Sequence, residues 1–97
     1  MPTYVTLINW SDQGIRNVRE TLDRAAKADE LAQKYGARFG QLYWTVGPYD
    51  IVATIEAPDD ESATAFLLEL GSLGNVRTTT LRAYDREEMS GIIERLG

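Results

Sequence analysis

The sequence predicts an α+β fold whose strands and helices follow the order βαββαβ, with one further helix at the C-terminal end. Three observations lead to this prediction. Four runs are rich in β-branched and aromatic residues. Two stretches between them carry apolar residues at three- and four-residue steps, which is typical of helices. A Gly-Pro turn separates the second run from the third. Two crossover helices on one face of a four-stranded antiparallel sheet make the ferredoxin-like arrangement.

The first strand and the first helix are predicted from the N-terminal third. Thr3–Trp10 (TYVTLINW) is β-rich and has no helical period. Ser11 then offers a side-chain oxygen that can cap a helix. From Ile15 to Tyr35 the apolar residues form one stripe, and Gly36 stands where a left-handed C-cap belongs. The pattern predicts a long helix and leaves open whether it is interrupted near Thr21.

The middle of the chain predicts a hairpin. Residues 39–46 (FGQLYWTV) and 49–57 (YDIVATIEA) both favour strand geometry. Between them lies only Gly47-Pro48, in which Pro48 fixes the φ angle of a turn's second position. A connection this short joins antiparallel neighbours, so the two strands are expected to pair.

The last third predicts a helix, a strand and a final helix. Asp59 is expected to cap a helix whose apolar residues run from Ala63 to Leu70. The acidic run Asp59-Asp60-Glu61 suits the positive end of that helix, and its spacing does not match a calcium loop. Residues 75–84 (NVRTTTLRAY) are expected to form the fourth strand. Asp85 and Glu88 match the carboxylate form of a capping box for the last helix.

Composition limits the classes of function. A chain of 97 residues suits one domain, predicted to span residues 1–97. The net charge of −5 argues against nucleic-acid binding, which depends on spare Lys and Arg. Without Cys or His the chain offers no thiolate nucleophile, His base or Cys/His metal site, which leaves only carboxylate sites for hard cations. No metal or cofactor is expected. No signal peptide or membrane span is recognisable, and a cytoplasmic location is expected.

A sheet with helices on one side leaves its other face uncovered. Alternation places Ile51, Ala53 and Ile55 toward the helices, and the same side is expected for Val5 and Leu7. The opposite residues are expected on the open face: Tyr4, Thr6, Ile8, Trp10, Tyr43, Thr45, Val52 and Thr54. Because this set is aromatic and uncharged, the open face is expected to pair with a second copy in a homodimer or a larger ring. In the alternative, the terminal helix folds over it.

Around Gly47-Pro48-Tyr49-Asp50 the sequence resembles the GYD domain family of small bacterial proteins, which is named for a Gly, a Tyr and an Asp at this hairpin. The similarity continues over residues 4–18, 49–61 and 73–84. It implies a ferredoxin-like fold that assembles as a dimeric α/β barrel, and it implies no reaction. Family members often carry Pro where this chain has Leu22, so a helix break at that point is left open.

Tyr49 and Asp50 are the candidate catalytic residues. Asp50 would act as a general base with its pKa raised by burial, and the Tyr49 hydroxyl would donate a hydrogen bond. In the alternative, Asp50 accepts hydrogen bonds from backbone N–H groups of the turn while Tyr49 packs in the core.

Asn9, Trp10, Tyr43 and Arg77 are the candidate ligand-binding residues. Asn, Trp and Tyr pockets on this fold resemble those of the antibiotic-biosynthesis monooxygenases, which need no metal or flavin. An arginine such as Arg77 could hold a carboxylate through two hydrogen bonds. The alternative is that the aromatic residues fill the core and the dimer interface, and that Arg77 and Arg82, on opposite faces of their strand, make salt bridges.

Taken together, these features favour a homo-oligomeric module that binds a small organic molecule or another protein. The site would lie between facing sheets or between sheet and helices. The alternative is a cofactor-independent enzyme, an oxygenase or isomerase, that uses Asp50 or Asn9 with a tyrosine. The sequence identifies neither the ligand nor the substrate, nor any oligomer size beyond a dimer.

Overall fold

The chain folds as one antiparallel sheet with helices, and a computed structural model describes all of it, residues 1–97. The strands are β1 (Thr3–Trp10), β2 (Arg38–Trp44), β3 (Ile51–Glu56) and β4 (Val76–Ala83). The helices are α1 (Asp12–Arg16), α2 (Thr21–Lys34), α3 (Asp60–Ser72) and α4 (Arg86–Glu94), with a short 3-10 turn at Val18–Glu20. The strand order β2-β3-β1-β4, with every pair antiparallel, confirms the predicted ferredoxin-like fold.

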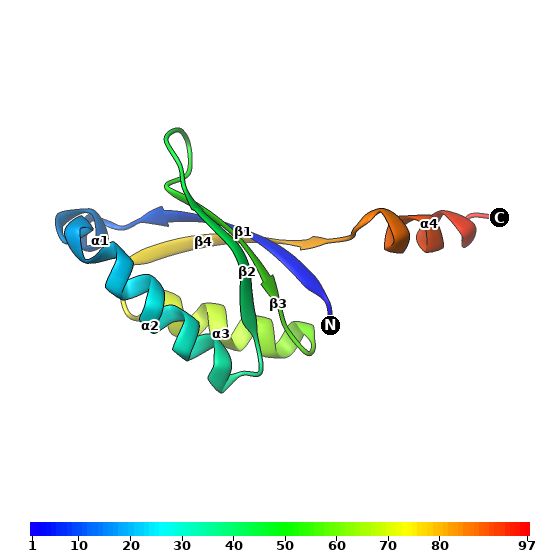
Figure 1. The fold of residues 1–97 in the computed structure, drawn as a ribbon, viewed down its shortest axis with the longest axis horizontal. Coiled ribbons are helices and arrows are strands. Elements are labelled where there is room, and N and C mark those ends of the chain that lie inside the picture. Colours follow the sequence, from blue (N-terminus) through cyan, green and yellow to red (C-terminus); the bar gives the residue numbers. More distant parts are fainter.

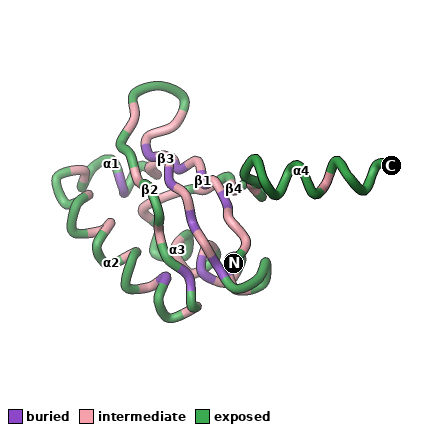
Figure 2. Tube along the Cα trace, turned by 45° about the vertical axis from the view of Figure 1, so that its right-hand side comes forward, coloured by how far each residue is buried: buried purple, intermediate pink, exposed green.

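Two layers and one projection make up the molecule (Figure 1). Helices α2 and α3 lie against the same side of the sheet, and no helix covers the other side. Helix α4 follows β4 and extends away from both layers, which stretches the molecule to 52 Å along its longest axis. Almost all of α4 is exposed (Figure 2). The alternative in which the terminal helix folds over the open face is therefore wrong.

Side chains cap the helices as the sequence predicts. The Ser11 and Asp59 side chains each accept a hydrogen bond from the backbone N–H three residues on, at 3.1 Å and 2.7 Å. Asp85 and Glu88 form the complete capping box of α4, with bonds of 2.7 Å and 3.1 Å. Gly36 ends α2 with a φ of 71°, a conformation that a side chain disfavours.

The predicted long helix is broken into α1 and α2, with the 3-10 turn between them. A contact with the loop before β4 holds α1 in place: a Cβ on Gly14 would lie 2.0 Å from the backbone oxygen of Asn75. The guanidinium of Arg24, on α2, donates to the backbone oxygens of Asn17 at 2.7 Å and Gly14 at 3.0 Å. The break thus exists although this chain carries Leu22, without a proline to enforce it.

The predicted orientation of β1 is wrong. Tyr4, Thr6 and Ile8 are buried on the helix-covered side, whereas Val5 and Leu7 face the other way. Alternation separates two sets of residues but cannot say which set faces the helices when both are apolar. Burial of the polar groups depends on distant partners: the Tyr4 hydroxyl donates to Asp60, and the Thr6 hydroxyl lies 3.0 Å from that of Thr80.

The predicted orientation of β3 is confirmed. Ile51, Ala53 and Ile55 are buried, and they alternate with half-buried residues. Ile55 joins a core cluster with Phe66 of α3 and Ala32 of α2, all at 1% exposure or less. The Phe66 ring meets Phe39 of β2 edge to face, with the two ring centres 5.8 Å apart. The tightest packing therefore lies beneath the N-terminal half of β1 and the C-terminal half of β3.

Candidate functional site

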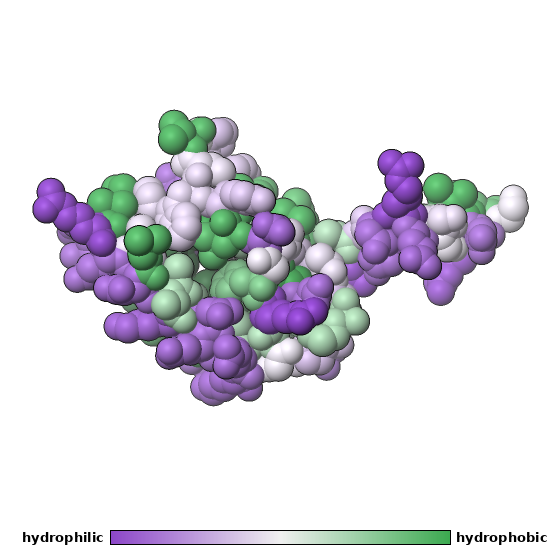
Figure 3. All heavy atoms as spheres, in the orientation of Figure 1, coloured by the Kyte–Doolittle hydropathy of each residue, from purple (hydrophilic) through white to green (hydrophobic).

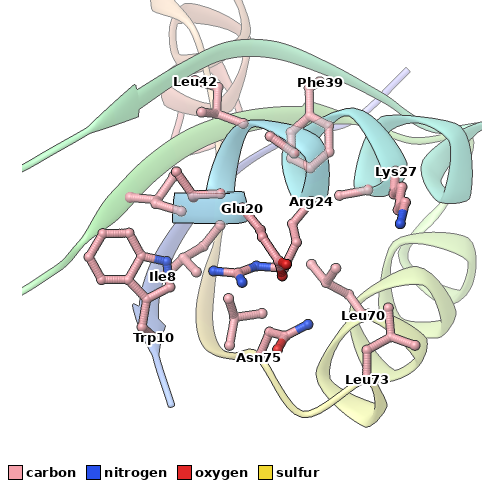
Figure 4. A pocket seen from close by; sticks show the side chains of 15 residues that line it. Ile8, Trp10, Glu20, Arg24, Lys27, Phe39, Leu42, Leu70, Leu73 and Asn75 are labelled. Atoms are coloured by element: carbon pink, nitrogen blue, oxygen red, sulfur yellow. The ribbon is translucent and has the colours of Figure 1, made fainter. Parts of the chain in front are cut away.

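A cavity opens between the sheet and the helices at the other end of the same layer. Its volume is about 360 Å³, within the range of small-molecule sites. Figure 4 shows that side chains from the sheet, from α2 and from the end of α3 surround it. Its lining includes Ile8, Trp10, Glu20, Arg24, Lys27 and Leu70.

Small residues on α2 account for the hollow. Ala25, Ala28 and Ala32 follow one another along the inner stripe of the helix. Ala32 is fully buried against Phe66, but Ala25 and Ala28 lie opposite Ile8 and Ile51 with no large side chain between them. The space is therefore bounded mainly by methyl groups and branched apolar side chains, and ten of its fifteen lining residues are hydrophobic. In the space-filling view, apolar atoms surround a hollow between the sheet and α2 (Figure 3).

Arg24 and Trp10 both offer hydrogen-bond donors to this cavity. Two N–H groups of Arg24 are bound to backbone oxygens, which fixes the position of the guanidinium and leaves its other three donors free. The indole N–H of Trp10 takes part in none of the chain's hydrogen bonds. No buried polar side-chain atom lacks a partner, so this N–H must be open to solvent. Its nitrogen lies on the side of the ring that faces the cavity (Figure 4).

Asp50 ties the β2–β3 hairpin to β1. Its carboxylate accepts a hydrogen bond from the backbone N–H of Trp10 at 2.9 Å, and its own N–H donates to the Ile8 oxygen at 2.9 Å. The backbone oxygen of Tyr49 accepts from the Thr45 hydroxyl at 2.6 Å. The Asp50 contact matches the kind expected of a structural aspartate, although its donor belongs to β1 and not to the turn. Neither Asp50 nor Tyr49 lines the cavity, and their catalytic assignment stays a prediction.

The four candidate ligand-binding residues do not meet in one place. Trp10 lines the cavity on the helix-covered side of the sheet. Asn9 pairs with Arg77 across β1 and β4, and Tyr43 pairs with Val52 across β2 and β3, all on the opposite face. A site that contained Asn9, Tyr43 and Arg77 would have to be completed by another molecule on that face. Their role in binding stays a prediction.

Arg77 and Arg82 point to opposite faces, as their spacing predicts, but neither forms a salt bridge within the chain. The Arg82 guanidinium lies over the rings of Tyr4 and Tyr84, 5.7 Å and 4.4 Å from their centres. Burial and the hydrogen bond to Asp60 raise the pKa of Tyr4 to about 12, so its hydroxyl stays protonated at neutral pH. These contacts lie at the packed end of the layer, away from the cavity.

Exposed apolar side chains gather on the open face and along α4. The apolar residues of the open face are Val5, Leu7, Tyr43, Val52 and Leu81, of which Tyr43 and Leu81 are 57% and 51% exposed. Along α4 and in the turn that follows it, Met89, Ile92, Ile93 and Leu96 recur at helical spacing, and Leu96 is 81% exposed. Patches of this kind on soluble proteins mark interaction sites.

Sequence reasoning missed most of the cavity. Of the four candidate ligand-binding residues only Trp10 lines it, because polar and aromatic side chains do not by themselves indicate where a space is left. The informative signal was the stripe of alanines at positions 25, 28 and 32, which leaves space opposite large residues of the sheet. Arg24 could not have been placed, since its contacts depend on the break between α1 and α2.

The fold and these surfaces define a small ferredoxin-like α+β protein with a cavity under its sheet and an uncovered apolar face. Within that class the chain belongs to the GYD domain family, whose model matches residues 4–93. This confirms the resemblance seen at the Gly47–Asp50 hairpin.

The chain is also similar to proteins of known name or structure. A Thermus thermophilus protein named "Glutamine synthetase and cystathionine beta-lyase binding protein" is 34% identical over 84 residues, which cover 86% of this chain and 88% of the relative. The crystal structure of FFRP-DM1 matches with a TM-score of 0.60 at 20% identity, covering 87% of this chain and all of the other. That of TTHA0845, also from Thermus thermophilus, matches at 0.55 and 28% identity, covering 89% and 100%.

The structure has neither a membrane-spanning helix nor a cluster of metal-ligating side chains. None of the helices has both the length and the apolar character that crossing a membrane requires. No three acidic side chains lie together in a group that could hold a metal ion.

Proposed function

We propose that this chain is a self-associating protein-binding module whose partner is an enzyme of the kind named for its relative, glutamine synthetase or cystathionine beta-lyase. The observation that carries the proposal is the relative itself, because 34% identity extends over most of both chains. Its name describes binding to two enzymes. The two uncovered apolar surfaces of this chain give such binding a physical basis.

Self-association is assigned to the open face. A four-stranded face of this size covers roughly 400 Å², so two facing copies bury roughly 800 Å² in total. A stable interface usually needs more than about 1,000 Å². The open face alone is therefore somewhat short of that area, and contacts at its rim supply the remainder, which leaves α4 free for a partner. This pairing would form the dimeric α/β barrel that the family resemblance implies.

Partner binding is assigned to α4. Met89, Ile93 and Leu96 stand at positions i, i+4 and i+7, the spacing with which an amphipathic helix fills an apolar groove. The helix is capped at its N-terminal end by Asp85 and Glu88, so it is formed before a partner arrives. A preformed helix loses less conformational entropy on binding than a disordered segment does.

Self-association is tested with Leu81→Lys, which places a charge on the open face. The matched control is Leu68→Lys, because Leu68 is 70% exposed on α3, away from that face. Light scattering after size exclusion should give a dimer or larger particle for the wild type and for Leu68→Lys, and a monomer for Leu81→Lys. A wild-type monomer at about 100 μM would overturn this part of the proposal.

Partner binding is tested with purified glutamine synthetase and cystathionine beta-lyase immobilised on a biosensor. The wild type should bind at least one enzyme, and Ile93→Gln should weaken that binding by roughly tenfold or more because it removes a central anchor. Glu87→Gln, at an exposed position on the opposite side of α4, is the control and should bind as the wild type does. If neither enzyme binds the wild type at tens of micromolar, the assignment to these partners fails.

A further inference from the structure

The cavity at the hollow end of the layer has the size and lining of a small-molecule site. Its volume of about 360 Å³ equals the liquid volume of about twelve water molecules. Most of the lining is apolar, so water there would make few hydrogen bonds and its release would favour an apolar occupant.

The charged residues that line the cavity indicate what kind of ligand it can bind. Arg24 and Lys27 are the two cations of the lining and Glu20 is its one carboxylate, whereas the whole chain carries a net charge of −5. None of these three takes part in a salt bridge, since the chain's two salt bridges join Lys34 to Glu69 and Arg38 to Glu56. An excess of unpaired positive charge in an acidic protein favours an anionic ligand.

The geometry of the donors favours a carboxylate among anionic ligands. The backbone oxygens of Gly14 and Asn17 hold the Arg24 guanidinium, whose remaining N–H groups can bind a carboxylate through two bonds. Figure 4 shows this guanidinium near the middle of the lining residues. It also shows the Trp10 nitrogen on the side of the ring that faces the cavity. Ile8 and Leu70 offer apolar contacts to the rest of the molecule.

We propose that this cavity binds a small monocarboxylic acid with an apolar body. The carboxylate lies toward Arg24 and the indole N–H of Trp10, and the body lies between Ile8 and Leu70. This binding depends neither on self-association nor on the enzyme partners, so it can fail separately from them.

The proposal is tested by titrating ¹⁵N-labelled protein with 3-phenylpropionate and, in parallel, with the neutral 3-phenylpropan-1-ol. The two probes share one apolar body, and the acid is ionised at pH 7. The acid should give saturable shifts at amides that line the cavity and should bind roughly fivefold or more tightly than the alcohol. Shifts confined to the open face, or no saturation below about 10 mM, would overturn the proposal.

Filling the cavity should weaken binding of the acid. Ala28→Leu adds three carbon atoms where the space is open, and it should weaken binding of the acid roughly tenfold or more. Ala26→Leu makes the same change at an exposed position of the same helix and should leave the affinity unchanged. Equal affinity in the two variants would contradict the proposed location, and the map of wild-type shifts decides the location if Ala28→Leu does not fold.

Removing positive charge from the lining should weaken binding of the acid and leave binding of the alcohol unchanged. Arg24→Met should lower the affinity for the acid roughly tenfold and leave the affinity for the alcohol unchanged. Lys27→Met should lower the affinity for the acid about two- to threefold. Arg19→Met, an exposed change outside the lining, is the control. Because Arg24 also holds α1, the amide shifts of α1 are compared first. If they move, Lys27→Met and the difference between acid and alcohol decide the outcome.

Discussion

The two ends of the layer between sheet and helices are built from similar pieces and are packed very differently. At one end Ala32 meets Phe66 and Ile55, and all three are at 1% exposure or less. At the other end Ala28 and Ala25 face Ile8 and Ile51 across a cavity of about 360 Å³. The difference comes from α3, which supplies the aromatic ring of Phe66 at the packed end, whereas only Leu70 and the C-cap residue Leu73 border the cavity at the other. An alanine stripe therefore makes a close contact or a cavity according to what its neighbour provides.

The largest expected effect is the loss of the ring that fills the packed end. Phe66→Ala should lower the free energy of unfolding by about 3–5 kcal/mol, because the cavity it leaves is fully enclosed. Leu70→Ala, at the hollow end, should cost only about 1–2 kcal/mol, since Leu70 already borders open space. Urea denaturation measures both, and equal losses would mean that the two ends do not differ in packing.

Next in size is a pair of identical changes on α2. Ala32→Leu should destabilise the protein by about 1–3 kcal/mol, because no room exists for the added atoms. Ala28→Leu should stabilise it by about 1–2 kcal/mol, because the new side chain replaces water in the cavity. Opposite signs in denaturation midpoints support the comparison. Destabilisation by both changes would show that the hollow cannot accept a leucine.

A smaller effect concerns the polar edge of the packed end. Tyr4→Phe removes the hydroxyl that donates to Asp60 and should cost about 1 kcal/mol. With a native pKa of about 12 against an ordinary value of 10.0, wild-type Tyr4 holds its proton in the folded state after the unfolded state has lost it. Its contribution to stability is thus complete below pH 10 and is lost as the pH rises from 10 to about 12.

The control for this pH dependence is the variant itself. Stability measured from pH 9 to pH 12 should fall less steeply for Tyr4→Phe than for the wild type, because the variant lacks the shifted group. Parallel curves would mean that Tyr4 titrates alike in the folded and unfolded states.

The smallest expected effect is at the surface of the packed end, where the Lys34 ammonium lies 2.9 Å from the Glu69 carboxylate. Hydrogen bonds from the Tyr35 hydroxyl and from Lys34 lower the pKa of Glu69, so the carboxylate stays ionised near neutral pH. Lys34→Met should move the urea midpoint by no more than the error of the measurement, because the pair is exposed and screened by salt. A clear loss of stability, removed by about 1 M NaCl, would show that this ion pair matters more than surface pairs usually do.

The sequence predicted the fold well because its signals are local. Ser11, Asp59 and Asp85 cap helices through atoms three residues away, and the Gly47-Pro48 turn joins strands that are adjacent in the chain. These interactions need no knowledge of the rest of the structure. The strand bounds accordingly fall within two residues of those predicted.

The orientation of β1 and most of the cavity were beyond local reasoning. Val5 and Leu7 are as apolar as Tyr4 and Ile8, and the choice between the two faces rests on Asp60 and Thr80, more than fifty residues away. Likewise Arg24 reaches the cavity only because the helix breaks and α1 seats against Asn75. Trp10 was identified by its chemistry, but its position in the cavity follows from the corrected orientation of β1.

The bonds at the base of the β2–β3 loop have a practical consequence for engineering. The Asp50 carboxylate connects that base to β1, and the backbone N–H of Thr45 donates to the backbone oxygen of Asp50 at 2.8 Å. The sheet therefore ends in a closed set of hydrogen bonds. The tip beyond it is exposed, and a Cβ on Gly47 would meet no atom within 4 Å. An epitope tag or a fluorescent label inserted between Gly47 and Pro48 should therefore be tolerated, and it would leave the cavity, the open face and α4 unaltered for binding studies.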